Sequence, residues 1–417
     1  MPEGRATLSV VMPTRNQAAF IHSAVRSVLD QAEVLELVVA DGGSTDGTQA
    51  ILQELASAYP GRLHWVSEGD AGPADAVNKA VGRTRGSVIG WLNSDDLYTL
   101  GAATRALRAF DERPDLVLVY GEGEHIDSHG ASLGRYPTLS PQTPLAAWAD
   151  GCPVCQPTAF FRRDCFVGLG GLDTGLRTAF DYEFWLRVWK AHPGQIGFVP
   201  EVQALSRLHA AGITLRMREQ VALEGLQVVH RHIGPAPVHW LLTHAGEALV
   251  RCPFEAAPDA VRAHLLGLAE QARVWLVPDG VAEFRKHLAA HRGWQLARAD
   301  FVADVHADGW APPELALRLK QPAGPPYRRL RVWGRHASPQ RNPLRLSLLD
   351  CSGTPLWQGG VSAAGAFNLM LPLPPKPDAA LPLTLRCDTP FVPAAIDPRS
   401  SDRRALAFQL DAIELLA

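Results

Sequence analysis

Two adjacent carboxylates follow a short apolar stretch near the middle of the first half of this chain. Val88–Leu92 is apolar, and Asn93–Asp96 (Asn-Ser-Asp-Asp) comes directly after it. Neighbouring carboxylates at the end of a buried strand are costly unless something neutralises their charge. Mg²⁺ or Mn²⁺ prefers such oxygen ligands and can bridge them to a diphosphate. The alternative is a solvated turn whose Asp caps the following helix.

A second acid, Asp41, follows the apolar stretch Leu37–Ala40. A carboxylate in this position can accept the N3–H of uracil or another base edge. The alternative is a Gly/Asp turn with a helix N-cap near Asp46 or Thr48, and the two interpretations are compatible.

The segment Glu68–Lys79 joins a flexible loop to the start of a helix. A functional interpretation places Asp70, Asp75 and Lys79 near a nucleotide and its phosphates. The alternative is that Asp75 and Lys79, which are four residues apart, form only a surface ion pair.

Two later residues are candidates for the chemistry itself. Asp181 lies among Phe180, Tyr182 and Trp185, and partial desolvation by these rings would raise its basicity, as a general base for a hydroxyl requires. The alternative is an amphipathic helix that buries its aromatic residues and exposes its acids. His209 could ligate a metal or contact a leaving diphosphate, although an isolated His is more often structural.

The elements that position these residues alternate between strand and helix. Apolar stretches of four to six residues between positions 7 and 120 are separated by segments with helical spacing, which predicts an α/β domain with a largely parallel sheet. Ligands bind beyond the carboxyl ends of such strands. The polar clusters starting at Pro13, Asp41, Glu68 and Asn93 all follow apolar stretches, so we expect them to converge on one crevice.

Composition narrows the functional classes. A formal net charge of -3 provides no general basic field for nucleic acid. The sequence contains no apolar run of about 20 residues, so no membrane-spanning helix is predicted. The N-terminus lacks the pattern of a signal peptide. We therefore expect a cytoplasmic protein. Peripheral binding at the inner face of the membrane is compatible with this expectation. Cys152 and Cys155 are interpreted as two small buried thiols and not as a redox or zinc pair.

Three parts are expected along the chain: a catalytic domain over 1–215, a helical segment over 216–320, and a small β-sandwich over 325–417. Residues 216–320 are rich in Ala, Leu, Arg and His with few strand signals. The Pro- and Gly-rich residues 321–326 are predicted to be a linker. Short alternating stretches after it predict antiparallel strands.

Eight motifs in order resemble those of family 2 glycosyltransferases over residues 7–215. They are PTRN (13–16), ADGGSTDGT (40–48), SEGDAGPADAVNKA (67–80), GWLNSDDLY (90–98), QPTAFFRR (156–163), GGLD (170–173), DYEFWLR (181–187) and RLHAAGIT (207–214). The resemblance implies a GT-A fold, an inverting mechanism and a divalent cation, Mn²⁺ or Mg²⁺.

The resemblance also assigns roles to individual residues. It implies that Asp181 is the catalytic base, that Asp41 contacts the nucleobase, and that Asp95 and Asp96 lie at the metal and ribose. It favours His209 as a third metal or diphosphate contact. The residues expected to bind the nucleotide-sugar are Thr14, Asn16, Asp41, Asp70, Asp75, Lys79, Asn93, Ser94 and Asp95.

Three departures from the family pattern qualify these expectations. Many members carry Asp where this chain has Asn93 and a second Asp where it has Gly42, and the QxxRW motif of processive synthases is absent. The absence of that motif favours addition of one sugar per encounter. The expected function is transfer of a sugar from a nucleotide-diphosphate donor, UDP-linked by expectation, to a glycan or lipid-linked glycan in envelope polysaccharide synthesis. The alternative is a non-catalytic glycan- or nucleotide-sugar-binding protein with a decayed site.

Overall fold

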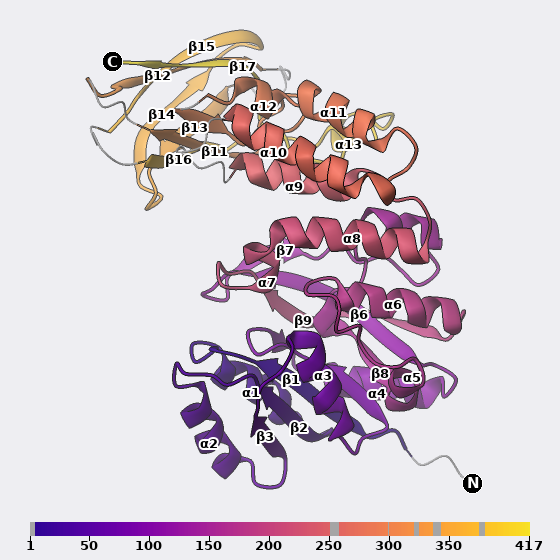
Figure 1. Cartoon of the computed structure of the whole chain (residues 1–417). Helices are drawn as coiled ribbons and strands as arrows, with labels where there is room; N and C mark the ends of the chain where they lie inside the picture. The colour runs from indigo at the N-terminus through magenta and orange to yellow at the C-terminus, as the bar shows by residue number, and fades with distance from the viewer. Residues whose placement is uncertain (1–4, 251–257, 299, 321–324, 337–342, 375–379) are drawn as a thin grey trace. The chain divides into compact units, whose positions relative to one another are not determined.

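The computed structural model describes residues 5–250, 258–298, 300–320, 325–336, 343–374 and 380–417. The chain divides into two compact units, one ending at Trp240 and the other starting at Leu241. Figure 1 follows the elements of both units, from indigo at the N-terminus to yellow at the C-terminus. The unit boundary falls inside the segment 216–320 that the sequence predicts to be one helical part.

The first unit is an α/β domain built on a nine-stranded mixed sheet. Its strands are β1 (Leu8–Thr14), β2 (Val34–Asp41), β3 (Leu63–Ser67), β4 (Val88–Trp91), β5 (Leu97–Tyr98), β6 (Leu118–Ile126), β7 (Ser132–Arg135), β8 (Phe160–Arg162) and β9 (Ile196–Arg207). Its helices are α1 (Ile21–Leu29), α2 (Thr48–Ala58), α3 (Pro73–Gly82), α4 (Ala102–Glu112), η1 (Leu145–Asp150), η2 (Gln156–Thr158), α5 (Arg163–Gly168), α6 (Phe180–Ala191), α7 (Ile213–Arg216) and α8 (Arg218–His232).

The strand order is β3-β2-β1-β4-β8-β6-β9-β5, with β7 paired to β6. The strands β3, β2, β1 and β4 are parallel, and they are the four apolar stretches that the sequence predicts. Strand β8 is antiparallel to both β4 and β6, and β6 is parallel to β9. The α/β fold with a mixed sheet is therefore confirmed. The sheet is less parallel than expected, because β5, β7 and β8 pair with their neighbours in antiparallel fashion.

Helical spacing explains how the sheet is covered. In α1, the residues Ile21, Val25 and Val28 recur every three or four positions and are fully buried, which places one apolar stripe against the sheet. Helix α1 packs on β2 and α2, while α3 packs on β1 and β2. The core formed in this way holds the carboxyl ends of the parallel strands in fixed positions.

The second unit contains helices followed by two antiparallel sheets. Its helices are α9 (His239–Val250, which starts before the boundary), α10 (Pro258–Gln271), η3 (Ala272–Val274), α11 (Gly280–Ala290), α12 (Arg292–Leu296) and α13 (Pro393–Ile396). Its strands are β10 (Phe301–Ala303), β11 (Glu314–Lys320), β12 (Arg329–His336), β13 (Leu344–Leu349), β14 (Pro355–Val361), β15 (Gly365–Pro372), β16 (Ala380–Cys387) and β17 (Gln409–Leu416).

The two sheets have the orders β10-β11-β16-β13-β14 and β15-β12-β17, and they share one apolar core, as the predicted β-sandwich requires. Strands β10 and β11 precede residue 325, so the sandwich includes part of the segment predicted to be helical. The reason is visible in β11, where Leu315, Leu317 and Leu319 are buried and alternate with more exposed residues. Residues 321–324 of the predicted linker lie outside the described residues.

Two smaller expectations can also be compared with the structure. Among the described helices, none is both long and apolar enough to cross a lipid bilayer. Cys152 and Cys155 are free thiols, Cys155 being buried and Cys152 partly buried, as interpreted from the sequence.

Candidate active site

The carboxyl ends of three parallel strands lie in register at one edge of the sheet. Thr14 of β1 pairs with Asp41 of β2, and Asp41 pairs with Ser67 of β3. The predicted convergence of the first three polar clusters is thus confirmed by the strand pairing. Thr14 is 6% exposed, and its buried hydroxyl has no hydrogen-bond partner among the described residues. A buried hydroxyl without a partner at a strand end is unusual and calls for an explanation, such as a ligand that binds it.

The carboxylate of Asp41 already accepts several hydrogen bonds from other residues of the protein. Asp41 is 1% exposed, and it accepts hydrogen bonds from Ser44 (N–H and Oγ), Gln49 (Nε2, 3.0 Å) and Ser67 (Oγ, 2.7 Å). These bonds hold the turn between β2 and α2, which is the structural alternative considered from the sequence. A nucleobase contact by Asp41 would have to be made in addition to them.

Asn16 fastens the loop after β1 to the same turn. Its side-chain Oδ1 accepts the N–H of Thr45 at 2.8 Å, and its own N–H donates to Ser44 Oγ at 2.7 Å. Asn16 has a φ of 55°, in the left-handed region that Asn tolerates better than most residues. Asn16 therefore shapes these two loops, and its contact with a nucleotide-sugar remains a prediction.

Asp70 reaches over Gly42 from the loop that follows β3. A Cβ atom added at Gly42 would lie 2.5 Å from Asp70 Oδ2, so the bare glycine is what admits this carboxylate. The other oxygen, Oδ1, accepts the N–H of Gly72 at 2.9 Å. Gly42, a position where the family resemblance led us to expect an acid, thus leaves room for an acid from another loop.

Asp75 and Lys79 form the ion pair that the sequence offered as the alternative. The Lys79 Nζ atom lies 2.9 Å from Asp75 Oδ2 and also donates to the carbonyl of Gly69 at 3.0 Å. Asp75 accepts the N–H of Ala71 at 3.0 Å. The pair closes the loop that carries Asp70, and contacts with a nucleotide by these two residues remain a prediction.

Asp95 and His209 meet although 114 residues separate them. His209 Nε2 lies 2.9 Å from Asp95 Oδ2. Strand β9 brings His209 to this point, because the Arg207 guanidinium donates to the Asp95 carbonyl at 2.8 Å and stacks over the ring of Phe20. Phe20 also packs against the His209 imidazole. Sequence reasoning overlooked Phe20 and Arg207, although Arg207 opens the last motif.

Asp96 turns its carboxylate into the protein. It is 3% exposed and accepts the N–H of Arg207 at 2.8 Å. Burial, and then the negative charge of Asp95, raise the pKa of Asp96 well above its usual value. A buried acid beside a second acid is stabilised by a nearby positive charge, and Arg207 acts in this way by lowering the pKa of Asp96.

Asn93 and Ser94 precede these acids in the turn after β4, and Asn93 contacts η2 through Gln156. The Asn93 side chain accepts from Trp91 Nε1 at 3.2 Å and donates to Gln156 Oε1 at 2.9 Å. Gln156 in turn donates to the Trp91 carbonyl at 2.7 Å. Ser94 is buried. The amide of Asn93 therefore braces the Asp95 turn, and Gln156, in the fifth motif, is the partner that sequence reasoning did not single out.

The donor set can be compared with what a divalent cation needs. Asp95 and His209 offer one carboxylate and one imidazole side by side, whereas no group of three or more His, Cys, Asp or Glu ligands occurs among the described residues. Mg²⁺ commonly takes one or two protein carboxylates and completes its shell with substrate phosphates and water. The residues present fit a cation that is held jointly by the chain and a bound diphosphate.

Asp181 is the second residue of α6 and is partly buried. Burial raises its pKa to about 6, and the N–H of Tyr182, which donates to Asp181 Oδ1 at 2.7 Å, opposes this rise. Its charge reaches Tyr136 and Cys152, whose pKa values are raised first by burial and also by Asp181. A carboxylate with a pKa near 6 is ionised at neutral pH yet more basic than an ordinary Asp.

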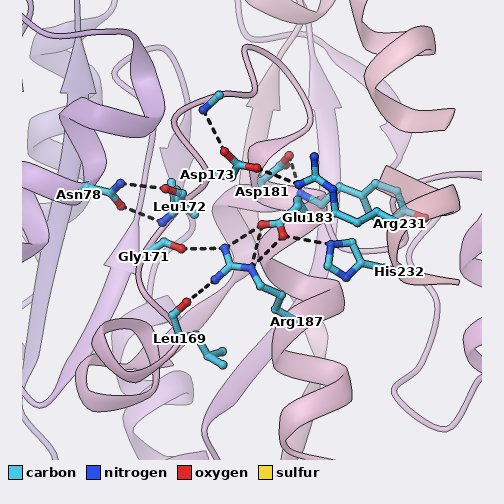
Figure 2. A network of polar contacts seen from close by, with 12 residues as sticks. Asn78, Leu169, Gly171, Leu172, Asp173, Asp181, Glu183, Arg187, Arg231 and His232 are labelled. Carbon is cyan, nitrogen blue, oxygen red and sulfur yellow. Dashed lines mark hydrogen bonds and ion pairs between the residues drawn. The ribbon is translucent and has the colours of Figure 1, made fainter. Parts of the chain in front are cut away.

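The amphipathic alternative for this helix is correct only for its aromatic residues. Phe184 and Trp185 are fully buried, but Glu183 is only 3% exposed. Glu183 accepts from Arg187 through both oxygens and lies 3.0 Å from His232 Nε2. Arg187 also donates to the carbonyls of Leu169 and Gly171, as Figure 2 shows. This buried ion cluster fixes the GGLD loop to the helix that bears Asp181.

Replacing Arg187 by Met is expected to destabilise the first unit by about 3 to 5 kcal/mol, because it leaves the Glu183 carboxylate buried with only His232 beside it. The free energy of unfolding from urea titrations measures this change. Arg113→Met is the matched control, since Arg113 pairs with Asp115 on the surface and such pairs contribute about 0 to 1 kcal/mol. A loss below 1 kcal/mol for Arg187→Met would contradict the cluster's structural role.

Comparisons with known proteins find relatives for the first half of the chain. Residues 9–166 match the family described as Glycosyl transferase family 2. The chondroitin synthase of Escherichia coli is 30% identical over 45% of this chain and 27% of its own length. A putative teichuronic acid biosynthesis glycosyltransferase of Bacillus subtilis, TuaG, is 36% identical over 27% of this chain and 45% of its own length. This chain therefore spans less than half of either relative.

A solved mannosyltransferase from Pyrobaculum calidifontis, in complex with GDP-Man and Mn²⁺, is 20% identical and covers 70% of this chain and 83% of its own, with a TM-score of 0.43. The match over residues 9–166 and the sequence relatives support a family 2 glycosyltransferase domain in the first unit.

Proposed function

We propose that this chain is an inverting glycosyltransferase that moves one sugar from a nucleotide-diphosphate donor, a UDP-sugar by preference, to a hydroxyl of a glycan or glycolipid acceptor in envelope polysaccharide synthesis. The observation that carries the proposal is the combination of a cation-compatible pair, Asp95 and His209, with a carboxylate of raised pKa, Asp181. The names of the relatives, a chondroitin synthase and a teichuronic acid glycosyltransferase, support the acceptor class.

The proposed donor site lies at the ends of β1, β2 and β4. The unpartnered hydroxyl of Thr14 and the carboxylate of Asp70 over Gly42 are available to the nucleoside. Asp70 offers an acceptor to a base N–H more readily than Asp41 does, because the Asp41 carboxylate is already saturated with donors. Asp95 and His209 would hold Mn²⁺ or Mg²⁺, which supplies positive charge to the departing diphosphate.

In the proposed reaction, Asp181 removes the proton of the acceptor hydroxyl. The oxygen attacks the anomeric carbon from the face opposite the nucleotide, the bond to the diphosphate breaks, and the configuration at this carbon inverts. A base with a pKa near 6 matches this task at neutral pH, since general base catalysis is most effective when the pKa lies near the working pH.

The proposal is tested by mixing the full chain with a panel of UDP-, GDP- and dTDP-sugars, Mn²⁺ and oligosaccharide acceptors, and measuring which small product appears. Free nucleoside diphosphate together with an extended acceptor is the expected result. Free diphosphate would indicate nucleotidyl transfer instead. Binding of a donor in a thermal-shift assay without release of any product would show a decayed, non-catalytic site.

The activity is expected to depend on pH through Asp181. Since the base works only when ionised, kcat/KM should rise about tenfold per pH unit below pH 6 and level off above it. Initial rates between pH 5 and pH 8, at saturating cation, measure this limb. A flat profile from pH 5 to pH 7 would argue against Asp181 as the base.

A further inference from the structure

Glu224 of α8 binds the turn that leads into the helix of the candidate base. Glu224 is 3% exposed. Its carboxylate accepts hydrogen bonds from the N–H groups of Arg177 (3.0 Å), Thr178 (2.8 Å) and Ala179 (3.0 Å), from Thr178 Oγ1 (2.8 Å) and from Gln220 Nε2 (2.8 Å). Three of these donors are consecutive backbone N–H groups, so one side chain fixes the path of the backbone there.

This turn needs an acceptor from outside. The first N–H groups of a helix have no partner within it, and a Ser, Thr, Asp or Asn at the N-cap usually binds one of them. The N-cap of α6 is Ala179, which has no side-chain oxygen to offer. Glu224, 45 residues further along the chain, binds the N–H of this N-cap residue and those of the two residues before it, so it holds the entry to the helix. Within the first turn, the N–H of Tyr182 is bound by Asp181 itself. Its negative charge also suits the positive end of the helix dipole.

The capped turn determines where Asp181 lies. Asp181 is the second residue of α6 and follows the cap residue Ala179 by two positions. A carboxylate so close to the start of a helix moves with the first turn, because it has no further turns on its N-terminal side to fix it. The position of the base thus depends on the hydrogen bonds that hold residues 177–179.

Helix α8, which carries Glu224, contacts the segment around Asp181 at two further points, which Figure 2 shows. Arg231 Nη1 lies 2.8 Å from Asp173 Oδ2, and His232 Nε2 lies 3.0 Å from Glu183 Oε1. Helix α8 also packs directly on α6. Glu224 is the most buried of the three contacts and the only one of them on the turn before Asp181.

We propose that Glu224 is a positioning residue for the catalytic base, which makes α8 part of the transfer site although it lies outside the family match over 9–166. This inference rests on the proposed function. Glu224 touches no reacting atom. It holds the carboxylate of Asp181 at the distance and angle from the acceptor hydroxyl that proton removal requires, and a displacement of about 1 Å at such a site can cost about 100-fold in rate.

The test compares Glu224→Gln with Glu36→Gln in the full chain. Glutamine keeps the size of the side chain but loses the charge and one acceptor oxygen. Glu36 is a matched control because it is a buried carboxylate that binds Ser9, the N–H of Arg85 and the Arg85 guanidinium on the part of β2 remote from Asp41. Both variants lose a buried charge, so both should lower thermal stability.

Three readouts separate positioning from general damage. Glu224→Gln is expected to lower kcat by about 10- to 100-fold, to leave the Kd for nucleoside diphosphate with Mn²⁺ within about twofold, and to speed amide hydrogen exchange at residues 177–179. Glu36→Gln is expected to keep kcat within about twofold and leave exchange at 177–179 unchanged. A kcat for Glu224→Gln within twofold of wild type, or an equal loss in both variants, overturns the inference.

The outcomes also distinguish this inference from the proposed function. If the wild-type chain releases no nucleoside diphosphate from any donor, the transferase proposal fails and the catalytic role of Glu224 fails with it. If the wild type is active and Glu224→Gln is equally active despite faster exchange at 177–179, only the positioning role is overturned.

Discussion

Asp181→Asn is expected to lower kcat by about 10²- to 10⁴-fold, the range that general base catalysis usually contributes. Asparagine has nearly the same shape and cannot accept the proton of the acceptor hydroxyl. Nucleoside diphosphate affinity should change by less than about twofold, because Asp181 lies on α6 and not on the donor strands. Steady-state rates and calorimetric titration with Mn²⁺ measure the two quantities. Retention of full activity with a suitable acceptor would exclude Asp181 as the base.

The same variant is expected to be more stable than the wild type at pH 8. Burial raises the pKa of Asp181 from 3.8 to about 6, so the folded state holds this proton more tightly than the unfolded state. The contribution to stability is therefore largest at low pH and is lost as the pH rises through about 6. About two units of pKa correspond to about 3 kcal/mol at most, which Asn would recover.

Asp173→Asn is a control for which the expected change in the free energy of unfolding has the opposite sign. Burial raises the pKa of Asp173, but the hydrogen bond from Arg231 and the N–H of Gly175 outweigh it and leave this pKa below its usual value. Removing its charge should destabilise the protein above pH 4, whereas removing that of Asp181 should stabilise it. Urea titrations at pH 5 and pH 8 test both. A destabilised Asp181→Asn at pH 8 would contradict a desolvated, ionised base.

Asp95→Asn is expected to weaken Mn²⁺-dependent nucleoside diphosphate binding by at least about tenfold and kcat/KM by about 10² to 10³, since it removes the only carboxylate that faces His209 in the described structure. A neutral amide also neutralises a cation poorly. Treatment of the wild type with EDTA should abolish activity, and added Mn²⁺ or Mg²⁺ should restore it.

The control for this experiment is Asp115→Asn, because Asp115 is exposed and pairs with Arg113 before the start of β6. Asp115→Asn should change the Kd for nucleoside diphosphate with Mn²⁺ by no more than the experimental error. Activity that survives EDTA, or a Kd for nucleoside diphosphate that does not respond to Mn²⁺ in the wild type, would remove the cation from the proposed mechanism. His209→Gln should reproduce the loss of Mn²⁺ response if the imidazole and Asp95 act on the same cation.

The sequence predicts the donor side of the site better than the base side. Thr14, Asp41 and Ser67 align because parallel apolar strands end at one edge of a sheet, which is a consequence of periodicity. The meeting of Asp95 with His209 was expected only from the order of the motifs, because no local pattern links positions 114 residues apart.

Other features could not be predicted, because they depend on which faces meet. In the sequence, Glu224 is one acid in a helix of mixed polarity, and its role arises from the docking of α8 on α6. The saturation of Asp41 by Ser44, Gln49 and Ser67 requires three separate segments to fold together. The strand β11 was detectable from its alternating leucines, but a composition rich in Ala, Leu and Arg favoured helix instead.

The way in which Arg207 joins the end of β9 to both acids has a thermodynamic consequence. Its N–H binds the Asp96 carboxylate and its guanidinium binds the Asp95 carbonyl, so folding alone brings Asp95 and His209 to 2.9 Å. The entropy needed to gather these ligands is lost when the chain folds and not when a cation arrives. Cation binding should therefore be fast, with little ordering of the backbone and a small change in heat capacity, as in a preorganised receptor.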